Sequence, residues 1–91
     1  MDQARFKRVL GKDLRNDKQE EGKYYIFDNR SAFSVNEIGA RIFELCDGSN
    51  NIQSICEKLM TIYDIDFETL RNDVSDLLVL MVENRIVKEI Q

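Results

Sequence analysis

The chain has 91 residues, of which 43% are hydrophobic and 33% charged, and its formal net charge is −4 at pH 7. This length and composition predict one domain, residues 1–91, around one small hydrophobic core. The chain has no histidine, the usual general base and the commonest metal ligand, so most hydrolase and metalloenzyme mechanisms are excluded. We therefore expect a protein that is not an enzyme and that holds no cofactor and no metal.

The chain shows no sign of export or membrane insertion. It has no apolar run long enough to span a bilayer, and Met1–Lys12 lacks the apolar segment of a secretion signal. We therefore expect a cytoplasmic protein. The two cysteines, Cys46 and Cys56, occupy apolar-periodic positions of expected helices and belong to no CxxC or zinc-ligand pattern. We interpret both as reduced core residues rather than as a disulfide or a reactive thiol.

The first 22 residues have only a weak structural pattern. Arg5–Leu10 alternates loosely between apolar and charged side chains, which is compatible with a weak strand or with a mobile arm. The stretch from Asn16 to Gly22 is polar and charged throughout, and it is expected to be a solvated loop.

A hairpin is expected next. Lys23–Phe27, made of aromatic and β-branched residues, is the best strand in the sequence. A second strand, Ser31–Val35, follows a connection short enough to force antiparallel pairing. We expect the weak first strand to pair on the other side of Tyr24–Phe27, so that Ala32–Val35 becomes a sheet edge.

From Ser34 onward the apolar spacing becomes helical. Ser34–Glu37 has the S-x-x-E spacing of a capping box, with Asn36 as a rival cap. Asp47–Gly48 is expected to end this first helix. Its buried stripe is Ile38, Ile42, Leu45 and Cys46.

A second helix is predicted to start at the cap Asn51 and to end near Asp64. Its apolar side consists of Ile52, Ile55, Cys56, Leu59 and Tyr63.

A long third helix runs from the cap Asp66 to Asn84, whose side chain tolerates the left-handed geometry of a helix end. Its last two turns widen the apolar surface until it nearly encircles the helix. The periodic residues are Leu70, Val74, Leu77, Leu78 and Met81, and the additional ones are Val79, Leu80 and Val82. The segment Ile86–Ile90 is expected to be a short extended end.

These elements predict an α+β, winged-helix-like domain with an N-terminal three-stranded antiparallel sheet packed on a three-helix bundle. Many such domains bind DNA through the third helix. From Tyr24 onward, however, six Lys/Arg stand against twelve Asp/Glu, a balance of −6, which disfavours contact with phosphates. We therefore expect no nucleic acid partner. A winged-helix DNA-binding regulator remains the alternative, and a small subunit that forms a homodimer through its third helix is a third hypothesis.

Several stretches resemble the PqqD family. They are Val35–Glu37, the Ile-Phe-Glu-Leu-Cys-Asp-Gly run at 42–48, Asp73–Val74 and Glu83–Val87. The resemblance covers about Tyr24 to Ile90. Two positions depart from the family pattern: Asn51 stands where threonine is common, and Arg85 stands where glycine is usual. Members of the family recognise the leader peptides of ribosomally made, post-translationally modified peptides.

The resemblance implies a stand-alone module that holds the leader of a precursor peptide for a separate modifying enzyme, a radical SAM enzyme or a leader peptidase. The leader would add as a strand at the 31–35 edge and dock against helix 66–84. Which pathway is served, be it quinone cofactor, lasso peptide or thioether-bridged peptide, stays open.

Eight residues are the candidates for peptide binding. On the edge, Phe33 and Val35 point to one side and Ala32 and Ser34 to the other. On the helix, Leu80 and Met81 are expected to be partly exposed in the open groove, beside Leu77. Asp73 is expected to receive a leader amide or cation, with a solvated helix face as the alternative. For each apolar candidate, a place in the core is the alternative.

Overall fold

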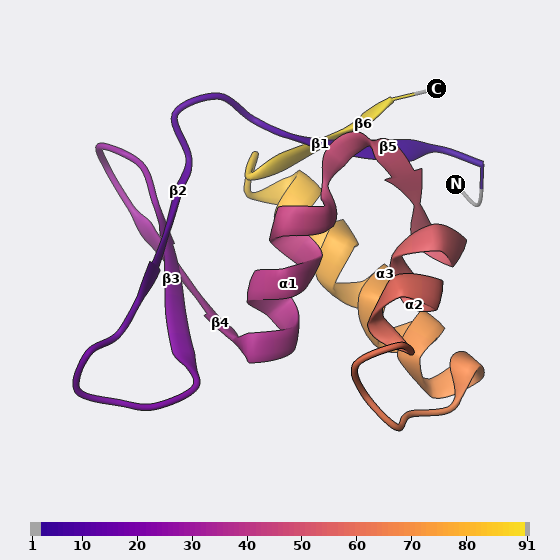
Figure 1. Ribbon diagram of the computed structural model, residues 1–91. Helices are drawn as coiled ribbons and strands as arrows, with labels where there is room; N and C mark the ends of the chain where they lie inside the picture. Colours follow the sequence, from indigo (N-terminus) through magenta and orange to yellow (C-terminus); the bar gives the residue numbers. More distant parts are fainter. Residues whose placement is uncertain (1–2, 91) are drawn as a thin grey trace.

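The computed structural model describes residues 3–90 and contains two small antiparallel sheets and three helices (Figure 1). The first sheet, in the order β2-β3-β4, consists of β2 (Asp13–Asn16), β3 (Lys23–Phe27) and β4 (Ala32–Asn36). The second, in the order β5-β1-β6, consists of β1 (Arg5–Arg8), β5 (Asp47–Asn51) and β6 (Val87–Ile90). The helices are α1 (Glu37–Leu45), α2 (Ile52–Leu59) and α3 (Phe67–Glu83). The predicted α+β class is confirmed.

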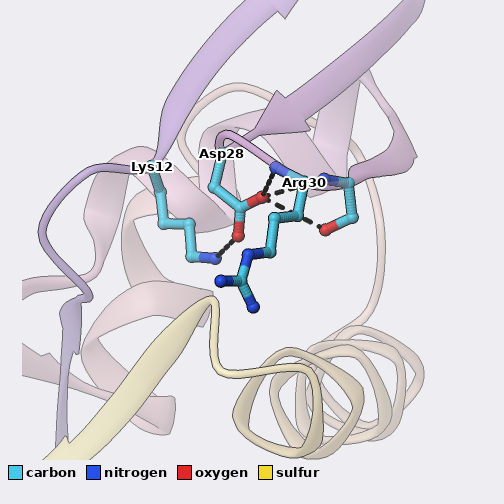
Figure 2. A network of polar contacts seen from close by, with 4 residues as sticks. Lys12, Asp28 and Arg30 are labelled. Carbon is cyan, nitrogen blue, oxygen red and sulfur yellow. Dashed lines mark hydrogen bonds and ion pairs between the residues drawn. The ribbon is translucent and has the colours of Figure 1, made fainter.

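The expected hairpin is confirmed, and its turn is organised by Asp28. Strands β3 and β4 pair antiparallel, with Tyr25 opposite Ser34, and β4 is an edge of its sheet. The Asp28 carboxylate accepts the backbone N–H groups of Arg30 at 2.7 Å and Ser31 at 2.9 Å, and it forms an ion pair with Lys12 (Figure 2). The hydrogen bond from Lys12, followed by those from the two N–H groups, lowers the pKa of Asp28 well below its usual range.

The third strand of this sheet is not the predicted one. The segment expected beside Tyr24–Phe27 forms β1, which instead lies at the centre of the second sheet, between β5 and β6. The neighbour of β3 is β2, with Leu14 opposite Ile26. The mobile-arm alternative is also wrong for the described part of this region, because Phe6 of β1 is fully buried. Met1, Asp2 and Gln91, which the predicted domain included, lie outside the described residues.

The first helix starts and ends differently from the prediction. Ser34 lies inside β4, and Asn36 is the cap, since its Oδ1 accepts the N–H of Gly39 at 2.9 Å. Helix α1 ends at Leu45, so Cys46 lies just beyond it, and the residues expected to end the helix form the start of β5.

The caps of the other two helices are confirmed. Asn51 and Ser54 form a reciprocal capping box at α2, and the Asp66 carboxylate accepts the N–H of Thr69 at 3.1 Å at α3. Helix α2 ends at Leu59, earlier than predicted, and Tyr63 lies in the following turn.

The hydrophobic core lies among the three helices and the second sheet, and Ile26 of β3 and Val35 of β4 join it from the first sheet. The largest fully buried side chains are Phe6, Ile42, Ile55, Leu59, Leu70, Leu78, Met81, Val74, Val87, Cys46 and Cys56. Both cysteines are free thiols, as predicted, and burial raises the pKa of Cys46 to about 12. Within residues 3–90, no helix combines the length and apolar character that a membrane span requires.

The left-handed residue after α3 is Arg85, with φ of 58°, and not Asn84, whose φ is −91°. A side chain with a Cβ is strained in this region, so the structure explains why glycine suits this position. We expect Arg85→Gly to raise the free energy of unfolding by roughly 0.5–1 kcal/mol, measured by urea denaturation with an unchanged slope. Asn84→Gly is the control, and it should not stabilise, because it removes the hydrogen bond from Asn84 to the Leu80 carbonyl.

Candidate functional site

A groove of about 380 Å³ opens between β4, the first half of α1 and the outer face of α3. Most of its lining is apolar. On α3, Leu80 is 49% exposed and its neighbour Val79 is 41% exposed, so the apolar surface of this helix extends beyond the core. The lining residues are Phe33, Ser34, Val35, Asn36, Ile38, Gly39, Ile42, Asp73, Leu77 and Leu80.

The structure brings most of the predicted residues together at this groove. Six of the eight line it: Phe33, Ser34, Val35, Asp73, Leu77 and Leu80. Ala32 lies outside the lining, exposed at the start of β4.

The placement of Met81 on the open surface is wrong, because this side chain is fully buried. Met81 follows Leu70 by eleven residues, or about three helical turns, so it returns to the buried side of α3. Of Leu80 and Met81, the two residues expected to be exposed, only Leu80 is accessible in the groove.

The contribution of α1 was missed. Of the four lining residues that were not predicted, Asn36 is the last residue of β4, and Ile38, Gly39 and Ile42 lie in α1. A Cβ on Gly39 would lie 2.8 Å from Val35 Cβ and 3.3 Å from Leu77 Cδ2, so the bare backbone lets β4, α1 and α3 meet at the groove floor. A glycine inside a predicted helix was the available signal, since such a residue often marks a close approach.

Beside the groove runs an unpaired strand edge. The N–H of Asp28 donates to the carbonyl of Ser31 at 3.1 Å, which identifies these two as a hydrogen-bonded pair of the β3–β4 ladder. In an antiparallel ladder the backbone groups of successive residues point alternately toward and away from the partner strand. Those of Phe33 and Val35 therefore face β3. Those that face away from β3, along the free edge, belong to Ala32, Ser34 and Asn36.

The chemistry available at the site is that of noncovalent binding. The edge offers backbone donors and acceptors, α3 offers an apolar wall, and Asp73 adds an exposed carboxylate. In the described range 3–90, no cluster of histidine, cysteine or acidic side chains could hold a metal ion. The arrangement suits an extended peptide chain, which can satisfy an open strand edge and place alternate side chains in the groove.

The model of the family described as coenzyme PQQ synthesis protein D (PqqD) matches residues 23–87. The chain belongs to the PqqD family. A PqqD-family relative, the PqqA binding protein of Methylococcus capsulatus, is 33% identical over 72 residues, which cover 79% of this chain and 75% of that protein.

Solved structures share the PqqD-family fold. The PqqD truncation of Methylobacterium extorquens PqqCD, described as a stand-alone recognition element for ribosomally synthesized and post-translationally modified peptides, has a TM-score of 0.77 at 22% identity. The match covers 91% of this chain and 87% of that one. TbiB1, solved in complex with the TbiA(β) leader peptide, has a TM-score of 0.71 at 15% identity, covering 90% and 94%.

Proposed function

We propose that this chain binds the leader region of a ribosomally made precursor peptide in the cytoplasm and presents it to a separate modifying enzyme. The observation that carries the proposal is the unpaired edge of β4 running directly beside an open apolar groove. Membership of the PqqD family supports it, as do a relative that binds PqqA and a structural neighbour solved with a leader peptide.

In this proposal the leader adds as a fourth strand to the β2-β3-β4 sheet. Hydrogen bonds to the outward backbone groups of β4 supply affinity that tolerates sequence change, and Leu77 and Leu80 select apolar side chains. The bound leader raises the local concentration of the core peptide at the modifying enzyme, a radical SAM enzyme or a leader peptidase. The chain itself performs no chemistry.

Ser34→Pro tests the proposal, because proline removes a backbone N–H that faces the free edge and leaves the ladder to β3 intact. We expect the affinity for the leader to fall about three- to tenfold, the loss that corresponds to one hydrogen bond. The measurement is fluorescence anisotropy with a labelled leader from the precursor encoded nearest to this gene. Circular dichroism should show an unchanged fold.

The matched control is Ser34→Ala, which keeps the N–H and should bind as the unaltered chain does. Unchanged affinity in a folded Ser34→Pro protein would contradict strand addition at this edge. An excess of duplex DNA should not displace the leader, whereas displacement would favour the DNA-binding alternative.

A further inference from the structure

A second hollow adjoins the groove at the end of β4. This hollow, of about 340 Å³, shares Ser34, Val35 and Asn36 with the groove and is completed by residues of the β2–β3 connection and the start of β3. Its other lining residues are Glu20, Glu21, Gly22 and Lys23. The groove and this hollow therefore adjoin at the last residues of β4, and together they make up one surface beside this strand.

This surface has a polar end and an apolar end. Strand β4 descends in Figure 1 from its turn to α1, whereas α3 rises, so the first half of α3 lies toward the end of β4 and the second half toward its start. Asp73 belongs to the first half of α3 and Leu80 to the second. The hollow with Glu20 and Glu21 adjoins the Asn36 end as well.

The polar end is negatively charged. Lys23 lies 3.5 Å from Glu20 and is the one cation that lines either the groove or the hollow in the described chain. Among residues 3–90, neither Asp73 nor Glu21 takes part in an ion pair. The lining therefore complements a positively charged side chain at this end.

We propose that this surface selects a peptide in which a lysine or arginine precedes two large apolar side chains at alternate positions. The inference rests on the proposed function. A strand added antiparallel to β4, the commoner orientation and the one used throughout this sheet, has its N-terminal side at Asn36. Its basic residue then faces Asp73, and its apolar residues face Leu77 and Leu80.

The distance between Asp73 and Leu80 along α3 agrees with this pattern. Asp73 and Leu80 are seven residues apart, which corresponds to about 10 Å along a helix axis. Three same-facing residues of a strand span about 13 Å. A lysine or arginine side chain is long and flexible, so its charged group can reach Asp73 although the span along the strand is longer than the span along the helix.

Three synthetic peptides test the inference by fluorescence anisotropy with the full chain. All share the same serine and threonine flanks, and their centres are Lys-Ser-Leu-Ser-Leu, Glu-Ser-Leu-Ser-Leu and the reversed Leu-Ser-Leu-Ser-Lys. We expect the lysine-first peptide to bind about three- to tenfold more tightly than the other two. The advantage should shrink at high salt, because the charges are exposed.

Asp73→Lys and Asp76→Lys form a matched pair of variants. Both residues are exposed on α3, both changes add the same charge, and only Asp73 lines the groove. Asp73→Lys should make the glutamate-first peptide the tighter ligand, whereas Asp76→Lys should preserve the original order. An equal effect of both variants would overturn the role given to Asp73. The overall electrostatic field of the chain would then determine which of the two peptides binds more tightly.

The outcomes separate this inference from the proposed function. Equal affinity of the lysine-first and glutamate-first peptides, with Ser34→Pro weakening both, overturns the charge selection alone. Equal affinity of the reversed peptide overturns the antiparallel orientation. Failure of all three peptides to bind, or binding that Ser34→Pro does not affect, overturns the proposed function together with the inference.

Discussion

Leu78→Ala is expected to lower the free energy of unfolding by about 2–5 kcal/mol, through lost burial and a residual cavity. Leu78 is fully buried on the core side of α3. Because small domains are stable by only about 5–15 kcal/mol in total, this one change should bring the protein close to unfolding. Urea denaturation followed by circular dichroism measures the effect. Met81→Gln should be similarly damaging, since it places an amide in the core.

Leu80→Gln should instead weaken leader binding and leave stability nearly unchanged. Its side chain is half exposed and lines the groove, so the melting temperature should change little while leader affinity falls about tenfold. Val79→Gln is the matched control, because Val79 is comparably exposed on the same helix but lies outside the groove lining, and neither quantity should change. If Leu80→Gln melts the protein as Leu78→Ala does, the outer face of α3 is core or a dimer interface, and the groove is misplaced.

Adding a side chain at Gly39 is expected to destabilise the protein and to close the groove. Helix propensity alone would make Gly39→Ala stabilising by about 1 kcal/mol. The new Cβ would lie 2.8 Å from Val35 Cβ, however, and neither atom is the flexible end of a side chain, so α1 and β4 must separate. Such overpacking typically costs about 1–3 kcal/mol, and we expect a net loss of stability.

Gly39→Val should destabilise the protein further and close the groove more completely. The methyl groups of the new valine occupy the floor of the groove, so we expect leader affinity to fall at least about tenfold. Thermal melting and leader anisotropy are measured on both variants. A more stable Gly39→Ala protein with unchanged affinity would contradict the close approach at this position.

Elements with strong local signals were predictable from the sequence. The aromatic and β-branched residues of β3 and the capping residues Asn51 and Asp66 encode their structures within a few neighbouring positions. Strand β5 is different, since Asp47–Asn51 contains no residue with high strand propensity. It is extended because it pairs with β1, and buried Asn50 is held there by the Leu45 carbonyl at 2.9 Å and the Lys58 ammonium at 3.0 Å.

Which strands pair with one another could not be predicted from local sequence patterns either. Strand β2 has a single apolar residue, Leu14, and forms by pairing with β3 rather than through its own pattern. The segment Arg5–Leu10, which contains β1, has a stronger apolar signal, but nothing in its spacing identifies β5 and β6, which are distant in sequence, as the neighbours of β1. At the site, the β4 edge and the outer face of α3 were predicted, whereas the floor supplied by Gly39 depends on how three elements approach one another.

The position of β1 at the centre of its sheet has a consequence for the order of folding. Arg5 lies opposite Ile90, so the β1–β6 ladder joins residues that are far apart in the sequence. Until β6 has docked, β1 lacks one of its two neighbours, and Phe6 lacks part of the surroundings that bury it. Closing a loop of this length carries an entropic cost that only the contacts of the packed core offset. We therefore expect the second sheet to form later in folding than the local β3–β4 hairpin.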